Sequence, residues 1–170
     1  MSSDIYTIIS GTNRPGSNTI RIAKQYLNLL REKGIDTRFV SLEGMDVNSR
    51  NDALRQLEKE ILIPTKKFIF VTPEYNGSFP GVLKAMMDHT DIEKVWWGKK
   101  ALLTGVSTGR AGNLRGMEHL TGVLHYLKMH VHHNKLPISV VNKLLNGEHT
   151  IEDAATLRVI NEQLDEFIRF

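Results

Sequence analysis

The stretch KFIFVTPEYNGSFPGVLKAMMDH, residues 67–89, gives the clearest indication of the fold. Its first part, 68–71, is a continuous apolar run, which is typical of a strand that is covered on both faces. A polar loop follows, and the apolar residues of 81–89 then recur at the spacing of an amphipathic helix. A buried strand followed by a loop and a helix is the repeating unit of parallel α/β sheets. This stretch therefore predicts such a sheet.

The same unit recurs before and after this stretch. The predicted strands are 5–9, 37–42, 67–72, 100–106 and 129–131, the last with an extension at 137–141. The predicted helices are 18–33, 51–62, 81–89, 112–127 and 151–170, the last with Thr150 as its N-cap. Alternation of this kind predicts a doubly wound, five-stranded parallel sheet with strand order 2-1-3-4-5 and helices on both faces. Such sheets bind ligands beyond the carboxyl ends of strands 1 and 3.

Composition narrows the class of protein further. A length of 170 residues predicts a single domain, residues 1–170. The chain has 22 Lys and Arg against 19 Asp and Glu, and this small excess gives no support for a nucleic-acid partner. The absence of cysteine excludes disulfides, thiolate metal sites and cysteine nucleophiles. With neither a signal-peptide pattern nor an apolar run of ~20 residues, we expect a cytoplasmic protein with no membrane partner.

The loop SGTNRPGSNT, residues 10–19, has the composition of a phosphate site. It enters a predicted helix, whose first N–H groups attract anions, and Arg14 supplies a full positive charge. A nucleoside-triphosphate loop is excluded because Ser17 stands where that motif needs lysine. A dinucleotide loop is disfavoured because Asn13 replaces its second glycine. The loop therefore favours a monophosphate, and an ordinary capped turn remains the alternative.

Two further loops follow the third and fourth predicted strands. The loop 72–81, TPEYNGSFPG, is longer than the roughly 2–6 residues of an ordinary strand-to-helix turn. Its two prolines stiffen it, and Tyr75 and Phe79 offer aromatic faces to a planar heterocycle. The loop 107–113, STGRAGN, is small and polar and suits the opposite side of the same ring.

On these three loops the chain resembles the NAD(P)H-dependent FMN reductase family, which has the flavodoxin-like fold. From Pro73 to Lys84 it matches Pro-Glu-Tyr-Asn-x-x-x-Pro-Gly-x-Leu-Lys at every specified position. The first loop follows Gly-Ser-x-Arg-x-x-Ser-x-Asn, with Thr12 and Thr19 in place of the family's first serine and its asparagine. The third follows Ser/Thr-Gly-x-x-Gly-Gly, with Asn113 in place of the last glycine.

The resemblance implies FMN as the cofactor, with NADPH or NADH as co-substrate. Its phosphate is expected at the first loop and its ring between the second and third, where Asn113 is expected to add bulk. The implied FMN-binding residues are Thr12, Arg14, Ser17, Asn18, Thr19, Pro73, Glu74, Tyr75, Asn76, Gly77, Ser107, Thr108, Gly109 and Gly112. The resemblance also implies a homodimer or homotetramer, with its interface at the helix 112–127 and the Tyr75 loop.

The function hypothesis follows from that cofactor. Hydride passes from reduced nicotinamide through bound FMN to a flavin, quinone, azo or metal-oxyanion acceptor by a ping-pong mechanism. Because the flavin does the chemistry, no catalytic residue is assigned to the protein. Two alternatives remain. One is a flavodoxin-type electron carrier, although such carriers are usually acidic and this chain has a net charge of +3. The other is a flavin-less relative with a binding role.

A histidine cluster lies outside these motifs. His125, His130, His132 and His133 are close in sequence, a pattern that invites a metal ion. No carboxylate lies adjacent to them in the sequence and cysteine is absent. The sequence therefore predicts no metal site, and a subunit contact or a solvated strand end is the favoured interpretation.

Overall fold

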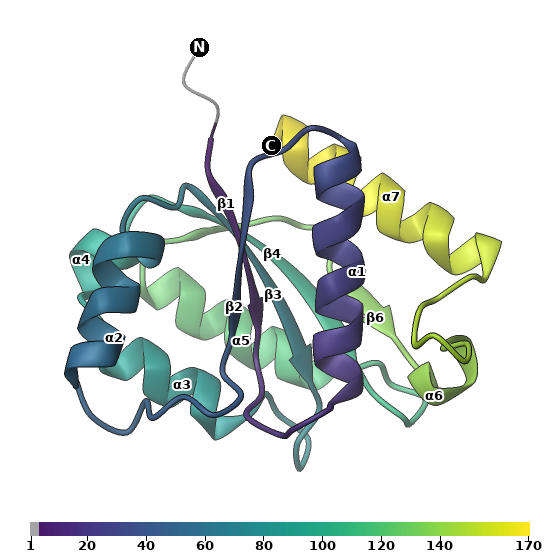
Figure 1. The fold of residues 1–170 in the computed structure, drawn as a ribbon, viewed down its shortest axis with the longest axis horizontal. Helices are drawn as coiled ribbons and strands as arrows, with labels where there is room; N and C mark the ends of the chain where they lie inside the picture. The colour runs from purple at the N-terminus through teal and green to yellow at the C-terminus, as the bar shows by residue number, and fades with distance from the viewer. Residues whose placement is uncertain (1–3) are drawn as a thin grey trace.

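The computed structural model describes residues 4–170, and a parallel sheet forms its centre. The strand order is β2-β1-β3-β4-β5, with β6 also paired to β4 (Figure 1). The strands are β1 (Tyr6–Ser10), β2 (Thr37–Ser41), β3 (Lys67–Pro73), β4 (Lys100–Val106), β5 (His130–Val131) and β6 (Leu136–Ile138). The expected flavodoxin-like order is confirmed.

Helices cover both faces of this sheet, as expected (Figure 1). They are α1 (Asn18–Glu32), α2 (Asp52–Leu57), η1 (Glu58–Leu62, a π-helical turn), α3 (Gly81–Asp88), α4 (Ile92–Val95), α5 (Leu114–Tyr126), α6 (Val141–Leu144) and α7 (Ala154–Arg169). Helices α1 and α7 pack on one face, and α2 to α5 pack on the other. Among residues 4–170, the helices all fall short of the length and apolarity that a membrane span requires.

Strand β3 shows why both faces need cover. Side chains alternate along a strand, so Phe68 and Phe70 join the core under α2 to α5. Ile69 and Val71 join the core under α1 and α7. All four are fully buried, which explains the continuous apolar run in the sequence. The parallel pairing of β3 with β1 and β4 brings the three carboxyl ends to one edge of the sheet.

The last predicted strand differs from the expectation. It is divided into β5 and β6, which pair with different parts of β4. In the link 132–135, the His132 N–H still donates to the carbonyl of Ala101 on β4 at 2.8 Å. The chain then turns, and the Lys135 N–H donates to the carbonyl of His133 at 3.0 Å. The expected extension at 137–141 is only partly a strand, because Val140 has a φ of 48° and the short helix α6 follows it.

The C-terminal helix begins later than predicted. Its N-cap is Asp153, whose carboxylate accepts the N–H of Thr156 at 2.8 Å, so Thr150 is the wrong cap. Thr150 instead donates its N–H to Asn146 in a turn, and the neighbouring Ile151 is buried in a bridge to Leu145. Packing of Ile151 against the core holds this segment out of the helix.

A buried polar network fixes α7 against the sheet. The Tyr26 hydroxyl on α1 donates to Gln163 Oε1 on α7 at 2.7 Å. Gln163 Nε2 donates to the carbonyls of Leu103 and Asn134 at 3.0 and 2.9 Å. Because buried polar groups are costly when unpaired, this network fixes the position of α7 relative to β4 and to the 132–135 link.

Candidate functional site

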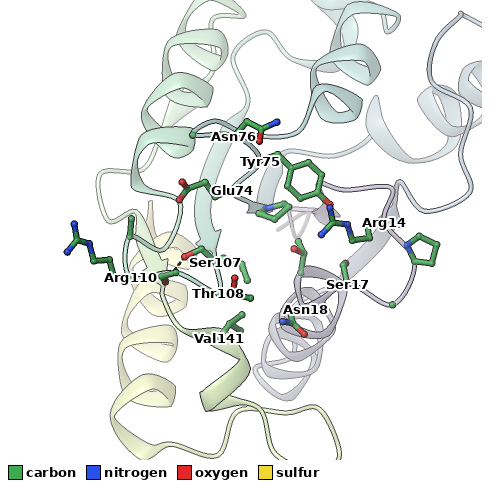
Figure 2. Close-up of a pocket in the computed structure, with 18 residues that line it drawn as sticks. Arg14, Ser17, Asn18, Glu74, Tyr75, Asn76, Ser107, Thr108, Arg110 and Val141 are labelled. Carbon is green, nitrogen blue, oxygen red and sulfur yellow. Dashed lines mark hydrogen bonds between the residues drawn. The ribbon is translucent and has the colours of Figure 1, made fainter.

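A cavity of about 640 Å³ opens at the carboxyl ends of β1, β3 and β4 (Figure 2). It lies between the three loops whose motifs predict a cofactor site. Twelve of the fourteen predicted binding residues line it: Arg14, Ser17, Asn18, Thr19, Pro73, Glu74, Tyr75, Asn76, Gly77, Ser107, Thr108 and Gly109. The other lining residues are Pro15, Gly16, Val106, Arg110, Ala111 and Val141.

The first loop presents a helix N-terminus to the cavity. Ser17 is the N-cap of α1, and its Oγ accepts the N–H of Ile20 at 3.2 Å. The first residues of α1, Asn18 and Thr19, also line the cavity, together with the exposed Arg14. The N–H groups of this first turn and the Arg14 guanidinium form the natural anion-binding end of the site.

Thr12 is one of the two predicted residues that do not line the cavity. Its side chain is buried, and its Oγ1 lies 2.6 Å from the Tyr75 hydroxyl. The Arg14 guanidinium lies 4.8 Å from the centroid of the same ring. Figure 2 shows the Arg14 and Tyr75 side chains next to each other. Both contacts connect the first loop to the second, so Thr12 helps to fix Tyr75, and its contact with an FMN phosphate stays a prediction.

The second loop contains a tight turn at Tyr75–Ser78. The two residues exchange backbone hydrogen bonds of 2.8 and 3.1 Å. Between them, Asn76 and Gly77 both have positive φ, at 51° and 78°. Asn-Gly is the favoured pair for such a turn. The Asn-Gly pair is therefore a turn signal in the sequence, and the motif-based prediction of the site does not use it. The turn fixes the direction of the backbone at the rim.

Helix α5 supports that turn from outside. His119 Nδ1 lies 2.9 Å from Ser78 Oγ. Arg115 packs against Gly77, with Nη1 3.0 Å from the position that a Cβ on this glycine would take. Neither Arg115 nor His119 stands out in the sequence, because only the fold brings α5 beside the second loop.

The third loop is held by its own serine. Ser107 Oγ donates to the carbonyl of Gly109 at 2.8 Å and accepts the N–H of Gly112 at 2.9 Å. Gly112 itself lies behind the cavity and does not line it. A Cβ on Gly112 would lie 2.5 Å from Pro137 Cβ, so this position needs glycine for close packing, and its contact with FMN stays a prediction.

The position of Asn113 differs from the expectation that its side chain adds bulk near the ring. Its side chain is fully buried and does not add bulk to the cavity. The amide nitrogen Nδ2 donates to the carbonyls of Thr72 and Pro73 at 3.0 and 2.9 Å. Its backbone has a φ of 63°, a conformation that asparagine tolerates better than most residues. Asn113 therefore joins the third loop to the end of β3.

One motif residue, Lys84, lies away from the cavity. Lys84 and Asp88, on α3, form an exposed ion pair with Nζ and Oδ1 2.6 Å apart. Val141, by contrast, lines the cavity although the sequence pattern places it in a strand extension. It reaches the site because its N–H donates to the carbonyl of Ser107 at 3.0 Å.

The residues present fit a phosphorylated planar ligand. The first loop brings a helix N-terminus and a guanidinium to the cavity, and the second and third loops bring backbone groups and the Tyr75 ring. Its volume is within the roughly 300–1,000 Å³ of small-molecule sites. The position beyond β1 and β3 is the switch point of a doubly wound sheet. Fold and site together define an α/β protein that binds a nucleotide-type cofactor. FMN is consistent with both the anion-binding helix N-terminus and the loops that suit a planar ring.

Comparison with known proteins establishes the family. The sequence model of the NADPH-dependent FMN reductase family matches residues 6–142, and the chain belongs to this family. An NAD(P)H-dependent FMN reductase of Pseudomonas aeruginosa is 27% identical over 175 residues, covering 96% of this chain and 94% of that protein. A 2-hydroxy-1,4-benzoquinone reductase of a Burkholderia species is 30% identical over 130 residues, covering 70% and 68%.

A solved structure supports the fold. The flavoenzyme NAD(P)H:acceptor oxidoreductase of Paracoccus denitrificans superposes with a TM-score of 0.81 at 20% identity, covering 98% of this chain and 96% of that one. The resemblance inferred from the three loops is thereby confirmed, together with the class that it implied. The chain is an oxidoreductase of an FMN-dependent, NAD(P)H-using family.

Proposed function

We propose that this chain holds FMN in the cavity and passes electrons from NADPH or NADH to a small-molecule acceptor. The observation that carries the proposal is the continuity of the cavity. One cavity is lined by the α1 N-terminus and Arg14 together with the Tyr75 and Ser107 loops. We propose one domain for residues 1–170.

The phosphate end uses charge and backbone donors. Arg14 neutralises the phosphate, and the first turn of α1, with Ser17, Asn18 and Thr19, supplies donors to its oxygens. Thr12 belongs to the same proposed phosphate set, and its hydrogen bond to Tyr75 also sets the position of that ring. Phosphate and ring sites are thus coupled through residues of this chain.

The ring end uses the second and third loops. Pro73 to Gly77 line one side of the cavity, and Ser107 to Gly109 line another. Bound FMN supplies the two-electron redox chemistry, which the protein orients and tunes. Nicotinamide and acceptor both have to reach the same ring, so we expect ping-pong kinetics. We assign no catalytic residue.

The acceptor class is a flavin, quinone, azo compound or metal oxyanion, and a quinone is the first candidate. A relative 30% identical to this chain is named as a benzoquinone reductase.

Arg110 lies on the rim, where Figure 2 shows its side chain directed away from the middle of the cavity. That position suits contact with a charged co-substrate at the entrance better than contact with FMN.

The assembly proposed is a homodimer or homotetramer, and the location proposed is the cytoplasm. Helix α5 carries two exposed apolar side chains, Leu114 at 51% and Tyr126 at 82% exposure. It also supports the Tyr75 turn, so a partner packed on α5 would border the cofactor site. Sedimentation of the FMN-loaded protein tests the assembly, and a monomer at micromolar concentration would contradict it.

Steady-state kinetics test the reaction. Initial rates are measured with NADPH and with NADH at several fixed concentrations of a benzoquinone. A ping-pong reductase gives parallel double-reciprocal lines, and the preferred nucleotide is the one with the higher kcat/KM. Intersecting lines would show that nicotinamide and acceptor bind at the same time, and would reject the ping-pong mechanism. Absence of turnover with every acceptor class would reject the enzyme and favour a carrier.

A further inference from the structure

The link 132–135, between β5 and β6, brings together three metal-ligating side chains that the sequence keeps apart. His132 and His133 come from the link itself, and Glu166 comes from α7. One ligand atom from each lies within 4.8 Å of the other two. None of the three lines the cofactor cavity. The carboxylate that the histidines lack beside them in the sequence is therefore supplied by the fold.

One of these ligands is fixed and another is adjustable. His132 is only 3% exposed, and its ring packs edge-on against Phe170 and Phe167, with centroids 5.0 and 6.0 Å away. The His133 ring lies 4.4 Å from that of His132 and is exposed. Such an arrangement offers an anchored imidazole in an apolar wall and a second one that is free to turn inward.

A second layer of hydrogen bonds orients the carboxylate. Asn134 Nδ2 donates to Glu166 Oε2 at 2.9 Å, and the Asn134 carbonyl accepts from Gln163 at 2.9 Å. Gln163 belongs to the buried network that fixes α7. Carboxylates that bind metals are typically held by such outer partners, which fix their direction. Glu166 is thus more restrained than an ordinary surface glutamate.

We propose that His132, His133 and Glu166 bind a divalent transition-metal ion of the zinc type, with water completing the coordination. Imidazole and carboxylate ligands suit Zn²⁺, and three protein ligands leave a position open. Bond lengths of about 2.1 Å place tetrahedral donors about 3.4 Å apart. Closing the present spacing needs small rotations of His133 and Glu166, both of which reach the surface.

Metal binding would break only one weak hydrogen bond of His132. His132 Nδ1 accepts the N–H of Asn134 at 3.3 Å, which is longer than an ordinary hydrogen bond. An ion at this nitrogen replaces only that weak contact. The ion would join the β5–β6 edge of the sheet to the C-terminal helix, so its binding raises the melting temperature by an amount that depends on metal concentration.

The test is calorimetric titration of the FMN-loaded, EDTA-dialysed protein with Zn²⁺. The ligand variants are His133→Ala and Glu166→Gln, because both side chains reach the surface and glutamine can still accept from Asn134. The matched controls are His125→Ala and His130→Ala, exposed histidines of the same sequence cluster that the geometry leaves out. Circular dichroism and metal-free melting temperatures confirm that each variant is folded.

We expect one Zn²⁺ per chain for the starting protein. Each ligand variant should weaken the affinity at least tenfold and abolish most of the metal-dependent rise in melting temperature. Each control should change the affinity by less than twofold. The proposal is overturned if no stoichiometric Zn²⁺ binds, or if the controls weaken binding as much as the ligand variants do. The latter result would assign any Zn²⁺ uptake to unspecific histidine binding.

Discussion

Asn113 offers a sharp test of how the third loop is attached to the sheet. Asn113→Ala removes the two hydrogen bonds of Nδ2 to the carbonyls of Thr72 and Pro73. At about 0.5–1.5 kcal/mol net for each bond, their loss costs about 1–3 kcal/mol. Alanine must also adopt the left-handed backbone of this position, which adds about 1–2 kcal/mol. We expect a total loss of about 2–5 kcal/mol in the free energy of unfolding.

Asn113→Gly is the matched control. Glycine takes the φ of 63° without strain, so this variant loses only the hydrogen-bond contribution, about 1–3 kcal/mol. Urea denaturation of both variants measures the two free energies of unfolding. Because Asn113 does not line the cavity, FMN affinity should fall only as the loop loosens. Equal stability of the two variants, or an alanine variant within about 0.5 kcal/mol of the starting protein, would contradict the roles assigned to the Asn113 side chain and backbone.

Three further variants test separate parts of the account. Arg14→Ala should weaken the affinity for FMN at least tenfold but the affinity for riboflavin much less, because the guanidinium acts on the phosphate. Both affinities are measured by fluorescence titration, and equal losses would show that Arg14 does not act on the phosphate. Gly105→Ala should lower the melting temperature by several degrees, because its Cβ would lie 2.1 Å from the Gly112 carbonyl oxygen; an unchanged value would contradict that packing. Burial lowers the pKa of the Lys99 ammonium from 10.5 to about 8. The charged ammonium therefore lowers the stability of the folded state below pH 8. The free energy of unfolding of the starting protein, relative to that of Lys99→Met, should rise between pH 8 and 10 in chemical denaturation. A difference that does not change with pH would show that the pKa of Lys99 is not shifted.

The sheet could be predicted because its strands carry their own signal. The apolar run of β3 and the helices after β1 and β3 are strong local patterns, and the strand order follows from rules for parallel sheets. The weaker elements escaped prediction. Helices α4 and α6 are each four residues long, too short to show a periodic pattern. The division into β5 and β6 depends on pairing with β4, which no local pattern reports.

The site was predictable at the level of loops and less so at the level of side chains. Each loop carries its motif in consecutive residues, and the fold brings all three to one edge of the sheet. Which side chains face the cavity depends on backbone angles and distant partners. Thr12 faces Tyr75, Gly112 packs on Pro137, and Asn113 binds the end of β3. Glu166 joins the two histidines only because α7 packs beside the 132–135 link.

The central claim is best tested by mixing the protein with FMN without oxygen, removing free flavin, and adding NADPH or NADH. The absorbance of oxidised flavin at about 450 nm is followed with time, since the protein only tunes this band. We expect retained flavin and rapid loss of the band with at least one nucleotide. Retained colour that neither nucleotide bleaches would indicate an electron carrier, and failure to retain FMN would contradict the cofactor site itself.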